Sequence, residues 1–308
     1  MKILIIIPFF GECPKWIEPF LLSCKYNPNI SWLIYTDFEK PIHCPDNVHF
    51  FNGSLSDFNC TSSRKLKLDI NISNPYKICD LRPAFGVIFE DFLQNVDFWG
   101  YSDIDLIYGD IRSFITDEIL NSYEIISTRE EYMSGHFALY KNQNKTNLLY
   151  QKCINYREIF QNNNHHYAFD ERSNLIGRRL FKPGKDILLK PLWSVKEKIF
   201  LKIKTISGRY RDGNNRDMTQ LTNILVQKGE LKLFRKNMVR SDLWFIKNKI
   251  KDWKIIWDSG KLTDATNIQK ILHFHMIVMK NNKNLTIQIP ENENKFVIRR
   301  EGIFFSNP

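Results

Sequence analysis

Residues 1–140 alternate short apolar runs with stretches whose apolar residues recur at helical spacing. Ile3–Ile7 is entirely apolar, which is typical of a strand that is covered on both faces of a parallel sheet. Helical segments are expected at 16–24, 63–70 and about 76–93, and further strands at 31–36, 48–51 and 98–101. This alternation predicts an α/β fold with a mostly parallel central sheet flanked by helices.

The second half of the chain is less regular. Strand-like patterns occur at 135–140, 253–257 and 271–279, and helical patterns at 145–160 and 169–180. No internal repeat, low-complexity linker or clean boundary divides the sequence. We therefore expect one main domain over residues 1–280, in which 182–254 is a basic and partly helical portion, and a tail, 281–308, packed on the same domain.

Composition sets the class of protein. The 308 residues are 43% hydrophobic and 25% charged, which is globular composition and excludes a disordered or fibrous chain. The six cysteines form no C-x-x-C pair, so reduced thiols of a cytoplasmic protein are expected, not disulfides or a zinc site. Pro8 ends the first apolar run too early for a signal peptide, and no run of about 18 apolar residues could span a membrane.

The net charge is +10, from 44 Lys and Arg against 34 Asp and Glu, which indicates a polyanionic partner. Basic residues outnumber acidic ones through 182–254, where they are interleaved with Trp, Phe and Tyr. That mixture suits peripheral contact with an anionic membrane, although a solvated charged face would have the same composition. Nucleic acid is not expected as a partner, because no zinc spacing, RNA-binding motif or basic recognition helix is present.

The most informative stretch is Phe98–Asp110, in which Asp103 and Asp105 follow an apolar, aromatic strand. Acids at the end of such a strand are costly unless they are solvated or bound to a cation. Two carboxylates one residue apart can hold Mg²⁺ or Mn²⁺ through oxygen and leave positions open for a diphosphate. We therefore expect a divalent metal site at Asp103 and Asp105, at the strand end where α/β sheets collect ligands.

These motifs, in their order along the chain, resemble those of GT-A glycosyltransferases, and more narrowly a bacterial family from capsule and lipopolysaccharide O-antigen loci that carries only a domain-of-unknown-function label. The matching pieces are IIPFFG at 6–11, PYKICDLRPA at 75–84, DFWG at 97–100, DIDLIYGDIR at 103–112, GHF at 135–137, FDE at 169–171 and HF at 273–274. The resemblance implies a Rossmann-like GT-A domain over 1–280 and metal-dependent transfer from a nucleoside diphosphate sugar, with UDP favoured.

The resemblance also implies metal ligands. Asp105 would bind the metal directly, and Asp103 would contact the metal or the ribose of the donor. His273 would be the third ligand, but His275 shares its face of the predicted strand and stays open as an alternative. A histidine in an apolar strand can also be an ordinary core residue, so His273 depends on its pairing with the D-x-D.

The remaining implied roles concern the donor. Four residues at the ends of the first two strands would hold the base and ribose: Pro8, Phe9, Phe10 and Asp37. Three residues on one helix entry would meet the diphosphate, ribose or a sugar hydroxyl: Lys77, Arg82 and, for the hydroxyl, Asp80. The backbone at Gly135 and His136 would pass beneath the transferred sugar, since glycine allows a close approach.

Two acids, Asp170 and Glu171, would lie near the reacting carbon. In an inverting enzyme one of them would be the general base, and in a retaining enzyme Asp170 would hold the donor sugar. The plain alternative for both is an exposed first turn of a helix, where acids suit the helix dipole.

The sequence therefore predicts a cytoplasmic enzyme, peripheral on the inner face of the membrane, with a lipid-linked or growing polysaccharide acceptor. Three alternatives remain. A haloacid-dehalogenase-type phosphatase also ends a strand on D-x-D, but near the start of the chain and before Thr or Val, whereas Leu106 follows here. A nucleic-acid-binding protein and a non-catalytic scaffold for polysaccharide assembly are the other two.

Overall fold

The computed structural model describes residues 1–163, 165–171, 217–288 and 294–305. Most of the helix predicted at 169–180, and the basic portion from 182 to 216, lie outside these residues. Among the residues described, no helix combines the length and apolar character needed to cross a membrane.

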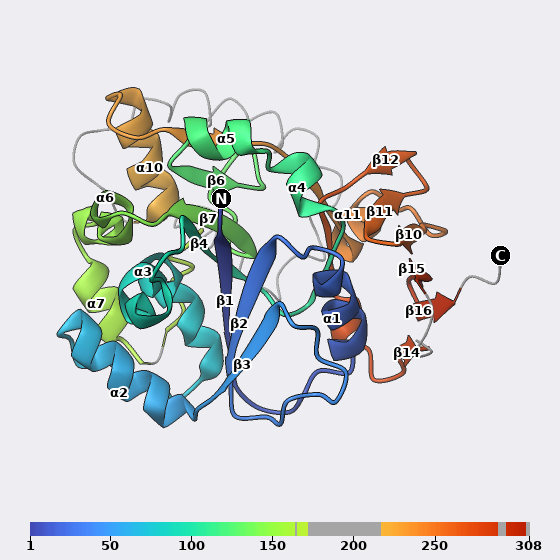
Figure 1. Cartoon of the computed structure of the whole chain (residues 1–308), viewed down its shortest axis with the longest axis horizontal. Helices are drawn as coiled ribbons and strands as arrows, with labels where there is room; N and C mark the ends of the chain where they lie inside the picture. Colours follow the sequence, from blue (N-terminus) through green and yellow to red (C-terminus); the bar gives the residue numbers. More distant parts are fainter. Residues whose placement is uncertain (164, 172–216, 289–293, 306–308) are drawn as a thin grey trace, which may run out of the picture.

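A seven-stranded sheet forms the centre of the molecule (Figure 1). Its order is β3 (Val48–Asn52), β2 (Ile30–Thr36), β1 (Ile3–Phe9), β4 (Phe98–Ser102), β7 (Phe137–Lys141), β6 (Ile125–Ser127) and β8 (Leu233–Arg235). The first four strands run parallel, as does the pair β6 and β8, whereas β7 is antiparallel to both of its neighbours. The predicted α/β architecture with a mostly parallel central sheet is confirmed.

Helices cover both faces of this sheet, because successive side chains of its strands point in opposite directions. Leu4 and Ile6 face a core built with α2 (Leu55–Leu66), η1 (Pro75–Ala84), α3 (Phe85–Ile88), α7 (Tyr156–Gln161) and α10 (Met218–Gln227). Ile5 and Ile7 face a second core built with α1 (Ile17–Lys25), α4 (Ile111–Phe114) and α5 (Asp117–Ser122). The short elements η2 (Glu90–Phe92), α6 (Asn144–Asn147) and η3 (Leu149–Lys152) complete this part.

Two smaller sheets follow. A six-stranded sheet has the order β12 (Gln269–Lys270), β11 (Lys261–Asp264), β10 (Ile255–Asp258), β15 (Lys295–Arg299), β16 (Gly302–Phe305) and β14 (Thr286–Ile287). It lies beside α1, across the central sheet from α2 and α3 (Figure 1). A three-stranded sheet, β5 (Leu106–Tyr108), β13 (His273–His275) and β9 (Val239–Ser241), shares residues with the cores of both larger sheets. The helix α11 (Asp242–Lys247) follows β9, and η6 (Met279–Asn281) follows β13.

Several helix boundaries differ from the predicted ones. The segment predicted as one helix at 76–93 begins as the 3-10 helix η1, because Pro83, inside this segment, lacks the N–H that a continuous α-helical ladder needs. The helix α2 begins eight residues before the predicted start at 63, where Ser54 and Asp57 form a reciprocal capping box. It ends at Leu66, because Lys67 adopts a left-handed conformation with φ 54°.

Candidate active site

The two acids of the D-x-D lie directly beyond the carboxyl end of β4. The backbone N–H of Asp103 donates to the carbonyl of His136 at 3.1 Å, which extends the pairing of β4 with β7 by one residue. The chain then turns into β5, which starts at Leu106. The side chain of Asp105 is buried, whereas that of Asp103 keeps 24% of its surface exposed. The predicted acidic turn at a strand end is therefore present.

The strand β13 brings His275 to these acids. His275 is paired with Leu106 across the ladder between β13 and β5, and the N–H of Met276 donates to the carbonyl of Asp105 at 3.0 Å. The Nε2 atom of His275 lies 3.4 Å from one carboxylate oxygen of Asp103 and 3.4 Å from one of Asp105. One atom of each of the three side chains lies within 4.8 Å of the others, a spacing at which a single divalent ion can bind them all.

His273 lies deeper than His275 on the same strand. It is fully buried, and its ring packs 5.5 Å from the ring of Phe137 and 5.1 Å from that of His136. Neither of its ring nitrogens has a hydrogen-bond partner within the described part of the chain. Of the two histidines left open by the sequence, His275 is the one placed beside both carboxylates, so it takes the position expected for His273.

Two protein cations balance the D-x-D. Arg82 on η1 is paired with Asp103, and Nζ of Lys280 lies 2.5 Å from Oδ2 of Asp105. Burial alone would raise the pKa of Asp105, but His275 and Lys280 outweigh it and hold that pKa below its ordinary value. Lys280 keeps 34% of its side chain exposed. It can therefore exchange Asp105 for another anion.

Arg82 also connects the D-x-D to the second acidic pair. Its guanidinium donates to Oδ2 of Asp170 at 3.0 Å and to the carbonyl oxygen of Gly135. Asp170 is buried, and its other oxygen, Oδ1, has no hydrogen-bond partner among the residues that the structure describes. Burial raises the pKa of Asp170 and Arg82 opposes that rise. A carboxylate in this state, with one free oxygen, suits a group that accepts a hydrogen bond or a proton from a substrate.

Glu171 lies against Gly135. A Cβ atom added at position 135 would come within 2.3 Å of Oε1 of Glu171, so a side chain there would displace the glutamate. Burial raises the pKa of Glu171, with Arg82 acting in the opposite direction. His136, which follows Gly135 in the chain, has its ring centroid 4.8 Å from that of His275. The structure thus brings together six of the residues singled out in the sequence: Arg82, Asp103, Gly135, His136, Asp170 and Glu171.

Lys77 and Asp80 are not open to the site. Both are buried, and Nζ of Lys77 lies 2.8 Å from Oδ2 of Asp80 and 2.7 Å from the carbonyl oxygen of Ile159. The Asp80 carboxylate also accepts the backbone N–H groups of Tyr167 and Phe169. Asp80 has ligand atoms near His166 and Asp170 as well, but its oxygens are already occupied, which makes this second group a poorer metal site than the D-x-D.

Of the residues expected to hold the nucleotide, Pro8, Phe9 and Asp37 are at least partly exposed, whereas Phe10 is buried. Asp37 is exposed, and its Oδ1 accepts the N–H of Gly11 at 2.8 Å. Pro8 and Phe9 are half-buried, and Phe9 packs against Phe38. Phe10 is instead a core residue between Tyr35 and Phe58, so its ring is not available to a base. Since β1 lies between β2 and β4, these residues and the D-x-D occupy one edge of the sheet.

Lys280 is the site residue that the sequence analysis missed. It follows His275 by five positions, in an otherwise apolar stretch that ends a predicted strand. A lone lysine there, close in sequence to a candidate metal ligand, was the available signal. The structure places it in the site because the segment after β13 turns back through η6.

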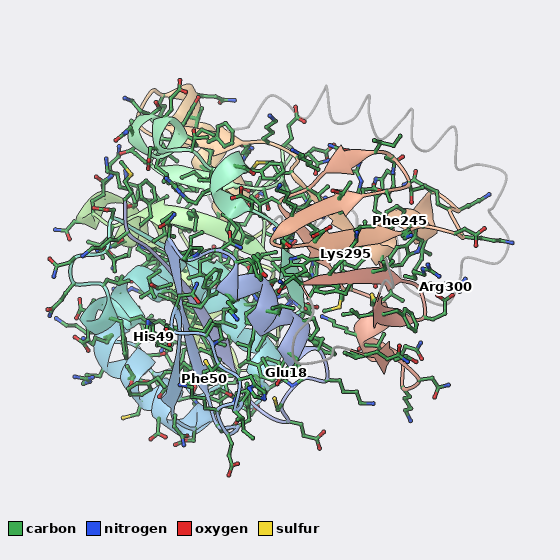
Figure 2. All side chains as sticks on the ribbon, turned by 45° about the vertical axis from the view of Figure 1, so that its right-hand side comes forward. Glu18, His49, Phe50, Phe245, Lys295 and Arg300 are labelled. Atoms are coloured by element: carbon green, nitrogen blue, oxygen red, sulfur yellow. The ribbon has the colours of Figure 1, made fainter. Side chains whose placement is uncertain are left out.

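A cavity formed by described residues lies away from the site. It has a volume of about 960 Å³ and is lined by the amino ends of β1 and β2 and by β3, including His49 and Phe50. Figure 2 shows these two residues across the molecule from Phe245, Lys295 and Arg300. The cavity is therefore at the opposite end of the parallel strands from the D-x-D.

A family model described as a family of unknown function, DUF6625, matches residues 5–304. The chain belongs to this family. Among curated proteins, none matches the chain in sequence.

Solved structures similar to this DUF6625 chain include glycosyltransferases. Galactosyltransferase LgtC, with donor and acceptor sugar analogues, has a TM-score of 0.33 at 12% identity, over 90% of this chain and 87% of that one. Mouse xyloside xylosyltransferase 1 scores 0.38 at 10% identity, over 92% and 100%. The glycosyltransferase GlyE of Streptococcus pneumoniae TIGR4 scores 0.39 at 11% identity, over 92% of this chain and 55% of GlyE. Likeness at this level says nothing of the activity of this chain.

Proposed function

We propose that the protein is a metal-dependent glycosyltransferase of the GT-A type that moves a sugar, a hexose by preference, from a nucleoside diphosphate sugar. The observation that carries the proposal is the group Asp103, Asp105 and His275 at the carboxyl end of β4, next to the buried Asp170. Two carboxylates and one imidazole are a suitable ligand set for Mn²⁺, and the nitrogen ligand favours Mn²⁺ over Mg²⁺, which binds proteins through oxygen.

The residues present fit such an ion. A bound divalent cation would supply charge neutralisation for the diphosphate leaving group. Lys280 and Arg82 are the protein cations on the two sides of the D-x-D. Lys280, which is partly exposed, would break its pair with Asp105 and instead pair with the diphosphate. Arg82, which is held by three partners, would keep Asp103 and Asp170 in place.

The donor would extend along the edge of the sheet. Phe9 and Asp37, at the ends of β1 and β2, would contact the base and ribose, for which we favour uridine. The sugar would lie above Gly135 and near the free oxygen of Asp170. In an inverting reaction Asp170 or Glu171 would take the proton of the acceptor hydroxyl, and in a retaining reaction Asp170 would hold the donor sugar.

The acceptor would be a lipid-linked or growing polysaccharide of the capsule or O-antigen type, reached at the inner surface of the cytoplasmic membrane. The net charge of +10 and the basic portion 182–254 support an anionic surface as partner. Membrane association would be peripheral.

The deciding experiment is a screen of nucleotide sugars for hydrolysis and transfer, with and without Mn²⁺. We expect one donor, a UDP-sugar, to be consumed only with the metal, and Asp103→Asn and Asp105→Asn to lower the rate at least about 100-fold with the fold intact. Asp110→Asn, at an exposed acid that caps α4, is the matched control. Full activity of either D-x-D variant without metal would refute the mechanism, and phosphatase activity without transfer would refute the function.

The choice between the two histidines has its own test. His275→Asn should weaken Mn²⁺ binding in calorimetry at least about tenfold, because it removes a ligand, whereas His273→Asn should change the affinity by less than about threefold. The reverse order of effects would return the ligand role to His273.

A further inference from the structure

The buried Asp80 holds the backbone that presents Asp170. Its Oδ2 accepts the N–H of Tyr167 at 2.9 Å and its Oδ1 accepts the N–H of Phe169 at 2.8 Å. The residue between them, Ala168, has φ 54°, in the left-handed region that residues other than glycine and asparagine rarely adopt. The carboxylate therefore stabilises a turn that the local sequence does not favour by itself.

The turn leads directly into the site. The N–H of Glu171 donates to the carbonyl of Ala168 at 3.1 Å, which closes the turn around Asp170. Asp80 and Arg82 lie two residues apart on η1, so one short helix makes two separate contacts with the segment 167–171. Asp80 accepts the backbone N–H of Phe169, the residue before Asp170. Arg82 donates a hydrogen bond to the carboxylate of Asp170 itself.

Lys77 makes the buried charge of Asp80 possible. It lies one turn earlier on η1, and its ammonium is paired with Oδ2 of Asp80 beneath the ring of Tyr167, at 4.7 Å from the ring centroid. The lone pairs of Asp80 are thus shared among one ammonium and two backbone amides. A sugar hydroxyl, which the sequence analysis expected Asp80 to bind, has no access to this fully buried carboxylate.

We propose that Asp80 is a positioning residue, which acts through the turn at Tyr167–Phe169 to set the place of Asp170, with Lys77 as its counter-ion. The proposal rests on the proposed function in one respect, the role of Asp170 near the reacting carbon. It replaces a donor-binding role for Lys77 and Asp80 with a role in the geometry of the acid.

A second buried aspartate provides a matched control. Asp264 is as buried as Asp80, pairs with Arg240, and accepts the backbone N–H groups of Thr266 and Asn267. It stabilises the turn between β11 and β12 in the six-stranded sheet and has no contact with the site. Replacing it should therefore affect folding in a similar way and leave the activity per folded molecule unchanged.

The experiment compares Asp80→Asn, Lys77→Met and the double variant Lys77→Met/Asp80→Asn with Asp264→Asn. Each single change leaves a buried charge or amide without its partner, so both should lower the melting temperature. The double variant removes both charges and should recover most of that loss. An asparagine, however, has one acceptor oxygen for two N–H groups, so the turn stays loose. We expect kcat of the double variant to remain about 100-fold below the native value, with KM for the donor changed less than about threefold.

A purely structural role makes the opposite prediction. If kcat recovers together with the melting temperature, or if Asp264→Asn lowers kcat equally, the positioning role is wrong. Hydrogen exchange of the peptide that contains 165–171 provides a readout that needs no activity. Its protection should fall in the double variant, and unchanged protection would also overturn the proposal. If the native protein transfers no sugar at all, the proposed function fails, and the exchange result still decides whether Asp80 holds the turn.

Discussion

Arg82 is the residue on which the two acidic pairs of the site depend. It is paired with Asp103 and Asp170 and donates to the backbone of Gly135, and its side chain lies over the ring of Tyr101. A guanidinium suits this task because its planar fork offers several donors in fixed directions. Asp103, a proposed metal ligand, and Asp170, the acid proposed to lie near the reacting carbon, are therefore held by the same cation.

The pH dependence of the reaction should depend on Arg82. Its positive charge stabilises the carboxylate of Asp170 and so opposes the rise in pKa that burial causes. In Arg82→Gln the burial effect is unopposed, and the pKa of Asp170 rises further. Because the reaction needs the ionised form, the acid limb of kcat/KM should move to higher pH by about one to three units.

Arg112→Gln is the control, because Arg112 pairs with the exposed Asp117. Its pH profile should match that of the native protein. An acid limb in Arg82→Gln at the native position would show that Asp170 does not govern the profile.

The chemistry of the site could be predicted from the sequence where it depends on local pattern, and not where it depends on pairing. Asp103 and Asp105 were predicted because an apolar strand runs into them. His275 and His273 point to the same face of β13, so only the pairing of that strand with β5 separates them. In the sequence, Lys77 and Asp80 resemble residues that bind the donor sugar nucleotide, but in the structure they form a buried ion pair with each other. The sequence pattern does not show this pairing.

At the scale of elements, the strand β4 is the support of the D-x-D. Gly100 lies at its centre, where a Cβ atom would come within 2.5 Å of the carbonyl oxygen of Ala138 and of a methyl carbon of Leu139 on β7. The close approach of β4 and β7 at this point requires glycine. Since Asp103 follows β4 directly and its N–H donates to the carbonyl of His136 ahead of β7, the separation of these strands sets the position of Asp103, the first of the proposed metal ligands.

Gly100→Ala should therefore destabilise the protein and disturb the metal site together. Overpacking of this kind costs about 1–3 kcal/mol, measured by urea unfolding. Mn²⁺ affinity should fall as well, because β4 must shift away from β7. Gly229→Ala is the control, since φ is 70° there but nothing lies within 4 Å of the added atom. It should cost stability without changing Mn²⁺ affinity, and a native-like Gly100→Ala would contradict the account of β4.

The elements themselves were predictable to different degrees. The strands β1, β2 and β4 could be predicted because they are covered on both faces and form continuous apolar runs. The three-residue strands β6 and β8, which are parallel to each other, were not predicted, because a run of three residues gives little pattern. The segment 76–93 is predicted as one helix because its apolar residues recur regularly, but Pro83 interrupts the α-helical hydrogen bonds and the first part forms the 3-10 helix η1. The strand predicted at 271–279 is only three residues long in the structure, where it is β13. The carboxylate of Asp242 accepts the N–H groups of the three residues Ile277–Met279, so these groups pair with no neighbouring strand and the chain turns there.

At the scale of the whole molecule, charge and exposed apolar residues meet around α11. Lys247, Lys249 and Lys251 are exposed, and Ile246 keeps 45% of its surface in solvent. Phe245 of the same helix, labelled in Figure 2, is buried against Trp253. This surface belongs to the described part of the basic portion and is the candidate for contact with an anionic bilayer.

The protein should float with phosphatidylglycerol vesicles at low salt and much less with phosphatidylcholine vesicles. The association should be lost toward 1 M salt, where the Debye length falls to about 3 Å. The variant Lys247→Glu/Lys249→Glu/Lys251→Glu should weaken it. The same change of net charge at three exposed residues elsewhere, Lys15→Glu/Lys25→Glu/Lys40→Glu, should weaken it less. Equal effects would mean that only net charge matters, and no salt-sensitive flotation would exclude the membrane as a partner.

During synthesis, the acids of the D-x-D leave the ribosome after Arg82 but long before Lys280 and His275, the other two groups that face them. Lys280 and Asp105 are 175 residues apart, and His275 reaches the acids only when β13 pairs with β5. A nascent or truncated chain that ends before β13 therefore carries two neighbouring carboxylates but not the ligand set that closes around a cation. The three-residue group at the D-x-D is therefore complete only when the last quarter of the chain docks.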